Sequence, residues 1–340
     1  MTELQTHHIQ DKETWEQLVQ HWPESNFLQS WNWGVFQQKM GKTVLALSFH
    51  RDQQYVAAAL CVREAAKRGT YLTIAGGPLL NWNDEELVTV VMQELKKVAL
   101  AQKCTFVRFR PQAIETPELL GKVKKTGCLP APMHLTADLT LQLDLHQSEE
   151  ELLAQMRKNT RYEVRRAEKL GITVRTSTDP AEIEPFYKQQ LEVAQKHGFV
   201  PFGSKFLMEQ FSTFVADGQA CLFHAYQGND ILASAFILCY HGEAVYHYGV
   251  STPANAKLPG SYACQWAAIR WAKAKGATQY NFWGIAPEGQ LSHRFAGVSL
   301  FKRGFGGTEV QYLPAQDLPV SWSYPLVRGF ETIRRKMRRL

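Results

Sequence analysis

The sequence predicts an α+β protein of two similar domains, each a mixed, mostly antiparallel sheet flanked by helices. Two observations carry this prediction. The chain has 340 residues, which suits two domains of about 100–200 residues each. The same order of strands, turn and helix also occurs in both halves at nearly constant spacing. A content of 45% hydrophobic and 21% charged residues is that of a globular protein and excludes disordered and collagen-like chains.

In the first half, the hydrophobic pattern predicts a helix, three strands, a second helix and a closing strand. The third strand ends in a Gly-Gly-Pro turn at 76–78. An apolar stripe with helical spacing marks the second helix. In chain order, the predicted elements span 11–20, 44–49, 55–63, 70–75, 84–102 and 105–109.

The second half repeats this order from the first hairpin onward. Gly228-Asn229-Asp230 is a hairpin turn, Ser261 is the predicted N-cap of the helix, and Gly276 is the residue that ends it. In chain order, the predicted strands and helix span 221–226, 231–240, 244–250, 261–275 and 279–282.

Three landmarks of the two halves are separated by 174 to 177 residues. The matched pairs are Pro78 and Pro253, Phe106 and Tyr280, and Gln53 and Asp230. Such regular spacing predicts two copies of one unit, an antiparallel meander followed by a helix and a strand. This unit resembles the core of the acyl-CoA N-acyltransferase (GNAT) fold. We predict a first GNAT-like domain over 1–145, completed by 316–340, and a second over 146–315.

The cysteines and the apolar runs indicate the compartment. Six cysteines are scattered without C-x-x-C spacing, mostly in apolar stretches, which predicts buried free thiols and no disulfide or zinc framework. The longest apolar runs, 56–62 and 233–240, are far below the ~18 residues of a membrane span, and the polar N-terminus lacks a secretory signal pattern. We expect a cytoplasmic monomer without a metal site.

The net charge of +6 is concentrated in two segments. Residues 157–175 hold seven Lys and Arg against two Glu, and residues 331–340 hold five against one. This placement favours a polyanionic partner, with a solvated helix face and a frayed basic tail as the alternative. Ser148 and Glu151 form a capping box and Gly171 ends the pattern, so we predict one helix over 148–171. Its basic residues recur every four positions, at Arg157, Arg161, Arg165 and Lys169, beside a second row of Lys158, Tyr162 and Arg166.

Several catalytic and nucleotide motifs are absent from the sequence: the G-x-x-x-x-G-K-[ST] phosphate loop, G-x-G-x-x-G after a strand, H-E-x-x-H and G-x-S-x-G. The loop that would cradle the pyrophosphate of coenzyme A is 253–261 in the second half. It has one glycine, and Pro259 cannot donate an N–H group. The corresponding stretch of the first half, 78–83, has no glycine. We therefore expect no cofactor.

Motifs across nearly the whole chain resemble those of the Fem family of peptidoglycan aminoacyltransferases. These are tRNA-dependent enzymes that add amino acids to the stem-peptide amine of a cell-wall precursor. The most specific match is the F-K-x-x-F-G-G sequence at 301–307. The others are Q-S-x-x-W-G at 29–34 with Lys39 and Gly41 after it, the basic helix at 157–171, the aromatic strand at 246–248, and the glycine turn at 281–285.

Three departures from the family pattern accompany this resemblance. No sustained heptads occur, so the coiled-coil insertion of longer members has no room here. Asn281 replaces a frequent acidic residue. After His197-Gly198, where some members place an Arg, the stretch reads Phe-Val-Pro-Phe at 199–202.

The resemblance implies roles for individual residues. The acceptor amine would attack the ester carbonyl of charged tRNA, and the Lys302 ammonium, with Phe301 beside it, would stabilise the oxyanion or neutralise a phosphate. The alternative for Lys302 is a strand-surface lysine. Tyr246 and Tyr248, two residues apart, would share a strand face and line the cleft, with core or surface packing as the alternative. The remaining acceptor assignments are Trp33, with core packing as the alternative, Lys39, with a solvated helix-end charge as the alternative, and Arg108, with a structural ion pair as the alternative. The residues assigned to tRNA are Arg157, Lys158, Arg161, Arg165 and Arg166.

The predicted function is therefore transfer of an amino acid from aminoacyl-tRNA to a peptidoglycan precursor, forming the interpeptide bridge. The amino acid stays open, as does the choice between a nucleotide-linked and a lipid-linked acceptor. Two alternatives remain: an acyl-CoA-dependent N-acyltransferase of the same fold, and a non-catalytic RNA-binding protein. The basic C-terminal tail is a candidate for contact with a membrane surface.

Overall fold

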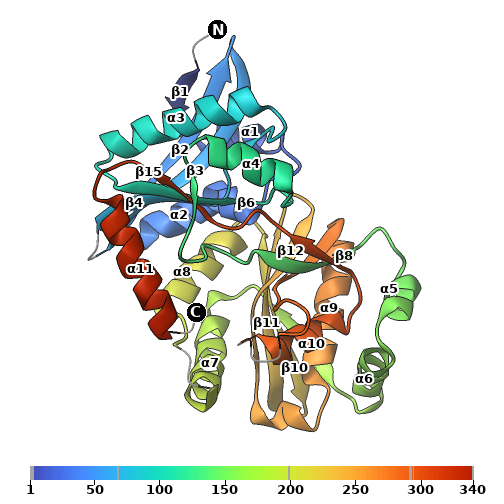
Figure 1. The fold of residues 1–340 in the computed structure, drawn as a ribbon. Coiled ribbons are helices and arrows are strands. Elements are labelled where there is room, and N and C mark those ends of the chain that lie inside the picture. Colours follow the sequence, from blue (N-terminus) through green and yellow to red (C-terminus); the bar gives the residue numbers. More distant parts are fainter. Residues whose placement is uncertain (1–3, 67–68, 198–199, 291–292, 294, 339–340) are drawn as a thin grey trace. The chain divides into compact units, whose positions relative to one another are not determined.

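The computed structural model describes residues 4–66, 69–197, 200–290, 293 and 295–338 (Figure 1). It forms two compact units. Unit 1 comprises Met1–Asp138 and Gln311–Leu340, and unit 2 comprises Leu139–Val310. In the described part of the chain, no helix combines the length and the apolar character needed to cross a membrane.

Within its described residues, unit 1 contains one eight-stranded sheet of order β1-β2-β3-β4-β6-β15-β7, with β5 paired to β3. The strands are β1 (Gln5–His8), β2 (Thr43–Arg51), β3 (Gln54–Ala66), β4 (Gly69–Gly76), β5 (Leu79–Leu80), β6 (Phe106–Pro111), β7 (Leu129–Pro130) and β15 (Gln316–Pro319). The helices are α1 (Lys12–Val19), α2 (Trp31–Lys39), α3 (Glu85–Ala101), α4 (Pro117–Lys125) and α11 (Tyr324–Arg338), with a 3-10 turn at Phe27–Gln29.

The sheet of unit 1 has a core on each face. On one face, Phe49 and Ile74 pack with the apolar stripe of α3, which includes Val91 and Leu95. The opposite face packs Ala58, Leu60 and their neighbours against Trp15 and Leu18 of α1. This alternation of strand residues between two cores produces a sheet with helices on both sides.

Unit 2 contains a seven-stranded sheet in its described residues, of order β14-β8-β13-β12-β11-β10-β9. The strands are β8 (Leu139–Asp144), β9 (Thr173–Ser177), β10 (Ala220–Gln227), β11 (Asp230–Tyr240), β12 (Glu243–Ser251), β13 (Gln279–Gly284) and β14 (Thr308–Gln311). The helices are α5 (Glu149–Gln155), α6 (Lys158–Lys169), α7 (Ile183–His197), α8 (Ser204–Val215), α9 (Gly260–Ala274) and α10 (Ala296–Arg303), with 3-10 turns at Pro180–Glu182 and Pro253–Ala256.

The predicted α+β fold with two copies of a meander, helix and strand is confirmed. In each copy, two antiparallel hairpins lead into a helix and a parallel strand: β2-β3-β4-α3-β6 and β10-β11-β12-α9-β13. The sequence placed the boundary between domains at 145/146, whereas the compact units divide at 138/139. The difference is β8, which pairs antiparallel with β13 and so belongs to the sheet of unit 2.

Two helix predictions are corrected. The single helix over 148–171 is two helices, because Met156 and Arg157 have extended backbone (ψ 141° and 142°) and Met156 turns into the core of unit 2. The helix predicted to start after Ser261 begins at Gly260, with Pro259 at its N-cap.

Candidate functional site

The central parallel strand pair differs between the two units. In unit 1, β4 pairs with β6 over five positions that end at Gly76↔Pro111. In unit 2, the pairing of β12 with β13 covers three positions of the described strands and ends at Val245↔Asn281. The two strands of unit 2 therefore part where the aromatic and glycine-turn motifs begin.

An extra residue in β12 separates the two tyrosines that the sequence placed on one face. Tyr248 lies opposite Phe236 and Tyr246 opposite Ile237, so His247 is the bulged residue. Tyr246 packs with Ile237 in the core that includes α9, whereas the Tyr248 ring contacts Phe236 on the other face. The prediction of a shared face is wrong, because a β-bulge shifts the alternation by one residue.

Lys302 is a buried helical residue, so the strand-surface alternative is wrong. It lies in α10 and is 7% exposed. Its Nζ donates a hydrogen bond to the backbone carbonyl of Gly284 at 2.7 Å and lies 5.7 Å from the centre of the Tyr246 ring. Burial lowers the pKa of Lys302 from 10.5 to about 7, because the ammonium has lost most of its solvating water.

The carbonyl that accepts from Lys302 belongs to a turn held by Asn281. The Oδ1 atom of Asn281 accepts the N–H of Trp283 at 2.8 Å, and its Nδ2 donates to Glu243 at 2.8 Å. Trp283 has a φ of +62°, a conformation that a bulky residue adopts only where its surroundings impose it. An aspartate at 281 could accept from Trp283 but could not donate to Glu243, so asparagine fits this carboxylate neighbour.

The rest of the 301–307 motif holds α10 in place. Phe301 packs against Tyr262 and Phe305, with ring centres 5.1 and 5.3 Å apart. Gly306 and Gly307 have φ values of +86° and +88°, where other residues are strained, and a Cβ on Gly307 would overlap the backbone of β8. Phe301 is thus a packing residue beside Lys302.

His247 is a residue of this site that sequence reasoning did not assign. Its Nε2 accepts from the side-chain amide of Gln210 at 2.9 Å, and its ring centre lies 5.9 Å from that of Trp283. Burial lowers the pKa of His247 to about 3, so the imidazole is neutral at physiological pH. The signal in the sequence was its position between two tyrosines.

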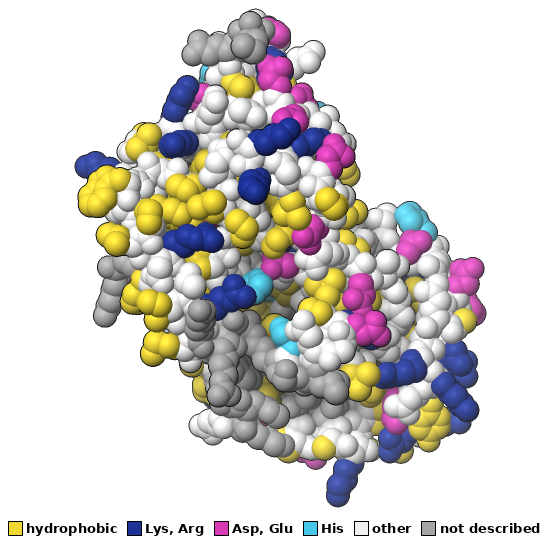
Figure 2. All heavy atoms as spheres, in the orientation of Figure 1, with side chains coloured by type: hydrophobic (Ala, Val, Ile, Leu, Met, Phe, Trp, Pro, Cys, Tyr) yellow, Lys and Arg dark blue, Asp and Glu magenta, His cyan; other side chains and the backbone are white. Residues whose placement is uncertain are grey.

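The basic side chains of α6 and of its N-cap Arg157, with Tyr162 among them, divide into two groups. Three arginines donate to backbone carbonyls: Arg157 to Leu300 (3.3 Å), Arg161 to Ala154 (3.0 Å) and Arg166 to Lys257 (3.2 Å). The second group is a row of exposed side chains at helical spacing, which we call the exposed row: Lys158, Tyr162, Arg165 and Lys169. Figure 2 shows Lys and Arg side chains gathered over the region that α5 and α6 occupy in Figure 1. Of the residues predicted to contact tRNA, Arg157, Arg161 and Arg166 therefore hold α6 in place, whereas Lys158 and Arg165 present their charges to solvent.

In unit 1, the Q-S-x-x-W-G motif connects α2 to the sheet. The side chain of Gln29 is buried, accepts the Leu60 N–H at 2.8 Å and donates to the Ala75 carbonyl at 2.7 Å. Ser30 caps α2 by accepting the Trp33 N–H at 3.1 Å. These contacts give the motif a structural role.

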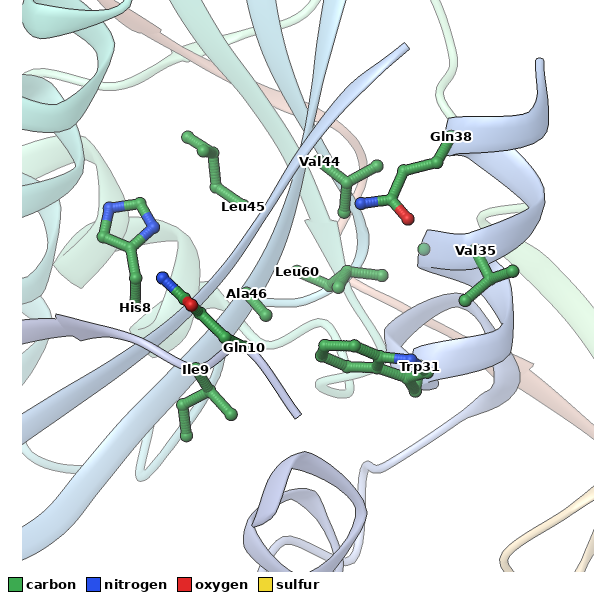
Figure 3. A pocket seen from close by; sticks show the side chains of 11 residues that line it. His8, Ile9, Gln10, Trp31, Val35, Gln38, Val44, Leu45, Ala46 and Leu60 are labelled. Carbon is green, nitrogen blue, oxygen red and sulfur yellow. The ribbon is translucent and has the colours of Figure 1, made fainter. Parts of the chain in front are cut away.

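Two expected acceptor residues lie on α2. Trp33 is half-buried, and its ring packs edge-on against Phe27 and Phe36, whereas Lys39 is exposed in the last turn. A cavity of about 420 Å³ lies beside the same helix, lined by apolar residues and by His8, Gln10, Trp31 and Gln38 (Figure 3). Trp33 and Lys39 do not line this cavity, although their neighbours do.

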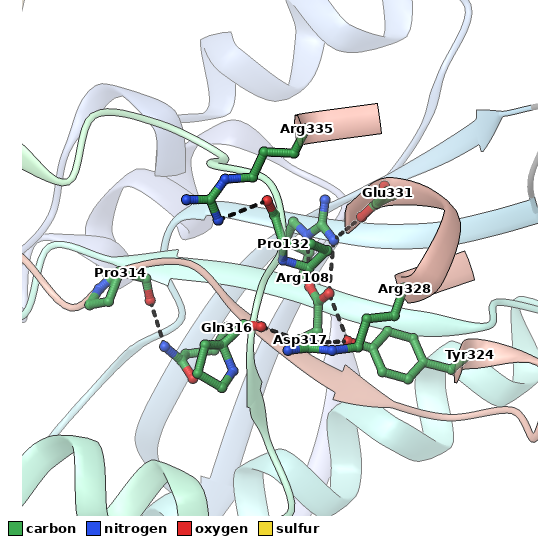
Figure 4. Close-up of polar contacts among 10 residues, drawn as sticks. Arg108, Pro132, Pro314, Gln316, Asp317, Tyr324, Arg328, Glu331 and Arg335 are labelled. Atoms are coloured by element: carbon green, nitrogen blue, oxygen red, sulfur yellow. Dashed lines mark hydrogen bonds and ion pairs between the residues drawn. The ribbon is translucent and has the colours of Figure 1, made fainter. Parts of the chain in front are cut away.

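Arg108, the third expected acceptor residue, forms a buried ion pair. It is 3% exposed; its Nε and Nη2 donate to the two carboxylate oxygens of Asp317 at 2.7 and 2.8 Å, and Nη2 also donates to Glu331 at 2.6 Å (Figure 4). Tyr324 donates to the same Asp317 at 2.9 Å. Of the two roles expected for Arg108, the structure shows the ion pair and corrects the substrate-binding one.

The helix starts that would receive a pyrophosphate are already occupied or charged. In unit 2, the Ser261 N–H donates to Asn255 Oδ1 at 2.9 Å. In unit 1, the carboxylate of Asp84 accepts the Leu87 N–H at 2.9 Å, and two glutamates follow in the first turn of α3. A pyrophosphate needs open N–H groups and a positive helix end, so both arrangements oppose it.

This fold and site define a tandem GNAT-like protein in which the second copy has the parted strands and a buried lysine. Comparison with known proteins agrees. An acetyltransferase (GNAT) domain model matches residues 154–292, and the FemAB family model matches residues 10–126. A crystal structure of FemX superposes with a TM-score of 0.85 at 16% sequence identity, covering 96% of this chain and 100% of that one.

Two named relatives extend the comparison. The chain is 21% identical over 287 residues to UDP-N-acetylmuramoylpentapeptide-lysine N(6)-alanyltransferase of Weissella viridescens, covering 81% of this chain and 84% of that protein. It is 30% identical over 109 residues to aminoacyltransferase FemA of Staphylococcus epidermidis, covering 32% of this chain. That match spans about a quarter (26%) of FemA. The chain is thus similar to the Fem family, through the FemAB family model over residues 10–126 and through the alanyltransferase over most of its length.

Proposed function

We propose that this protein is an aminoacyltransferase that moves an amino acid from aminoacyl-tRNA to the stem-peptide amine of a peptidoglycan precursor. The observation that carries the proposal is Lys302, a buried ammonium held by one carbonyl where β12 and β13 part. The similarity to the Fem family and the printed activities of the relatives, FemA and the Weissella alanyltransferase, support the same reaction.

The chemistry needs charge stabilisation more than a new nucleophile. The acceptor amine attacks the ester carbonyl, a C–N bond forms, the C–O bond to the ribose breaks, and the amine proton passes to the leaving oxygen. An ammonium has three N–H donors, and the Gly284 carbonyl accepts a hydrogen bond from one of those of Lys302. The other two can serve the oxyanion of the tetrahedral intermediate, in surroundings where little water weakens them. The ester is already activated, so positioning and this charge suffice.

The exposed row of α6 is the proposed contact for the tRNA backbone. Lys158, Arg165 and Lys169 present their charges to solvent along one helix face, with Tyr162 among them. Phosphates bind such charges without base readout, and an exposed aromatic ring can stack on a base. Arg157, Arg161 and Arg166 support this row by holding α6 through backbone carbonyls.

Acceptor binding is assigned to unit 1, beside α2. The cavity there combines apolar walls with histidine and amide side chains, a lining that suits a substrate with both sugar and peptide parts. Lys39, exposed at the end of the same helix, offers a charge for the precursor's phosphates. Arg108 has no place in this assignment.

The test is a transfer assay with purified protein, a mixture of charged tRNAs and either the nucleotide-linked or the lipid-linked precursor. We expect a precursor whose mass increases by one aminoacyl residue, and we expect acetyl-CoA to give no product. Transfer from acetyl-CoA would favour the acyl-CoA alternative. Tight tRNA binding without transfer to either precursor would favour the RNA-binding alternative.

A further inference from the structure

The C-terminal helix α11 has an inner face fixed to unit 1. Tyr324, Val327 and Glu331 are buried on this face. Glu331 pairs with Arg108 at 2.6 Å, and Arg328 donates to the Pro130 carbonyl at 2.6 Å (Figure 4). These contacts fix the rotation of the helix about its axis, and therefore also fix which residues lie on the face opposite unit 1's core.

The opposite face is an apolar stripe. Leu326, Phe330, Ile333 and Met337 follow at i, i+4, i+7 and i+11, and Trp322 stands one turn before them. These five side chains are between 55% and 88% exposed. Figure 2 shows hydrophobic side chains along the edge where Figure 1 draws α11. Such a continuous exposed stripe on a surface helix marks an interaction site.

The segment that carries this stripe is strongly positive in sequence. Residues 324–340 contain six Lys and Arg and one Glu, a net charge of +5. The single glutamate, Glu331, is buried against Arg108, and two of the cations, Arg328 and Arg335, donate to the carbonyls of Pro130 and Pro132. Arg334 is half-buried and lies one residue from the stripe residue Ile333.

We propose that α11 is an interfacial helix that lies in the surface of an anionic lipid bilayer. Leucine, phenylalanine and tryptophan on one face, beside Lys and Arg, is the composition of helices that insert at the boundary of headgroups and acyl chains. The basic residues add attraction to anionic lipids. A second copy of the chain fits less well, because its helix would bring a like charge of +5 against this one. RNA would use the charge but not the apolar stripe. The inference does not depend on the proposed transferase activity.

The experiment is co-sedimentation of the full chain with vesicles of phosphatidylcholine alone or with 30% phosphatidylglycerol. We expect the protein to bind the mixed vesicles at least ~10-fold more tightly, and to be released when NaCl is raised from about 50 to 500 mM. Phe330→Ser should weaken binding about tenfold, because a phenylalanine loses its burial among acyl chains.

The matched control is Leu100→Ser, since Leu100 is 56% exposed on α3 of the same unit and Phe330 is 55% exposed. This control should bind vesicles as the unchanged protein does. Circular dichroism melting of both variants checks that neither has lost its fold. As a second readout, vesicles with brominated acyl chains should quench tryptophan fluorescence less in Trp322→Phe than in the unchanged protein.

Four results would overturn the proposal, and the first three concern vesicle binding and oligomeric state. The first is no preference for the phosphatidylglycerol vesicles. The second is equal weakening by Phe330→Ser and Leu100→Ser. The third is a dimer in solution that Phe330→Ser dissociates while vesicle binding is absent, which would assign the stripe to a second copy. A further result would also overturn it: loss of tRNA affinity in Phe330→Ser, with vesicle binding unchanged, would assign the stripe to RNA.

Discussion

The hydroxyl of Tyr246 occupies the space in which a side chain at position 249 would stand. A Cβ on Gly249 would overlap the Tyr246 hydroxyl and ring. The same ring lies under the Nζ of Lys302, 5.7 Å from its centre. The absence of a side chain at 249 therefore allows the tyrosine to pack beneath the buried ammonium.

Replacing this glycine should disturb both stability and activity. In Gly249→Ala, the methyl group forces Tyr246 out of its position, and overpacking of this kind costs about 1–3 kcal/mol. Urea unfolding should show a lower midpoint, and transfer should fall because Lys302 loses its neighbour. Gly121→Ala is the control: Gly121 is in α4 with nothing within 4 Å of an added Cβ, so stability should rise by up to about 1 kcal/mol. Equal midpoints for the two variants would contradict the packing argument.

Removal of the Lys302 charge should remove most activity. Lys302→Met keeps the length of the side chain, and transfer should fall by at least ~10²-fold, as for the loss of an oxyanion donor. The fold should persist, since methionine is easier to bury than an ammonium. Activity within a few-fold of the unchanged protein would return Lys302 to a structural role.

Because the pKa of Lys302 is low, the unchanged protein and Lys302→Met should differ in how stability and activity depend on pH. The folded lysine titrates at about 7 instead of 10.5, so between these values the unfolded chain binds the extra proton. The stability that Lys302 contributes therefore rises with pH across this window, and the rise should be absent in Lys302→Met. In transfer assays, the ratio of unchanged to variant activity should fall as pH rises through about 7, because the ammonium is the active form. A ratio that increases would indicate a base.

Three charges of the exposed row can be removed together. Lys158→Gln, Arg165→Gln and Lys169→Gln in one chain should weaken binding of charged tRNA and make the slope of log K against log salt shallower by about two to three units. Precursor affinity should not change. The single variant Arg161→Gln is a different control, because Arg161 donates to carbonyls of α5 and should lower stability instead. If the triple variant loses precursor affinity and keeps tRNA affinity, the row binds the acceptor's diphosphate.

Arg108→Met should destabilise unit 1 strongly. The variant leaves the carboxylates of Asp317 and Glu331 buried without their cation, at 0% and 1% side-chain exposure, which costs about 3–5 kcal/mol. Arg51→Met is the comparison, because the Arg51–Glu86 pair is on the surface and contributes at most about 1 kcal/mol. Thermal melting of both variants measures the difference, and similar melting temperatures would contradict it.

The repeated fold could be predicted from the sequence because strand and helix periods are local. Turn residues and apolar spacing located both copies of the meander, and the family motifs located Lys302. The 175-residue offset linked the two halves. These signals each lie within a short stretch of chain.

The rest depended on contacts that no short stretch reveals. The bulge at His247 shifts Tyr246 to the other face without changing the residue pattern of β12. The break at Met156 arises because the core of unit 2 takes its side chain. The partners of Arg108 are 209 and 223 residues away in sequence. Lys302 is buried against the turn at Gly284. The apolar spacing of its own helix gives no information about that turn, so its burial could not be predicted from the sequence.

The position of β15 between β6 and β7 makes the order of synthesis important. The ribosome must synthesise all of unit 2 before Asp317 emerges. Asp317 follows Arg108 by 209 residues, so the ion pair can form only roughly 10–40 s after Arg108 is made, at typical elongation rates. During this interval β6 is an open sheet edge that holds an arginine without its carboxylates. The nascent first copy is therefore exposed to chaperones and to mispairing until β15 and α11 complete it, whereas the inserted second copy has already been synthesised.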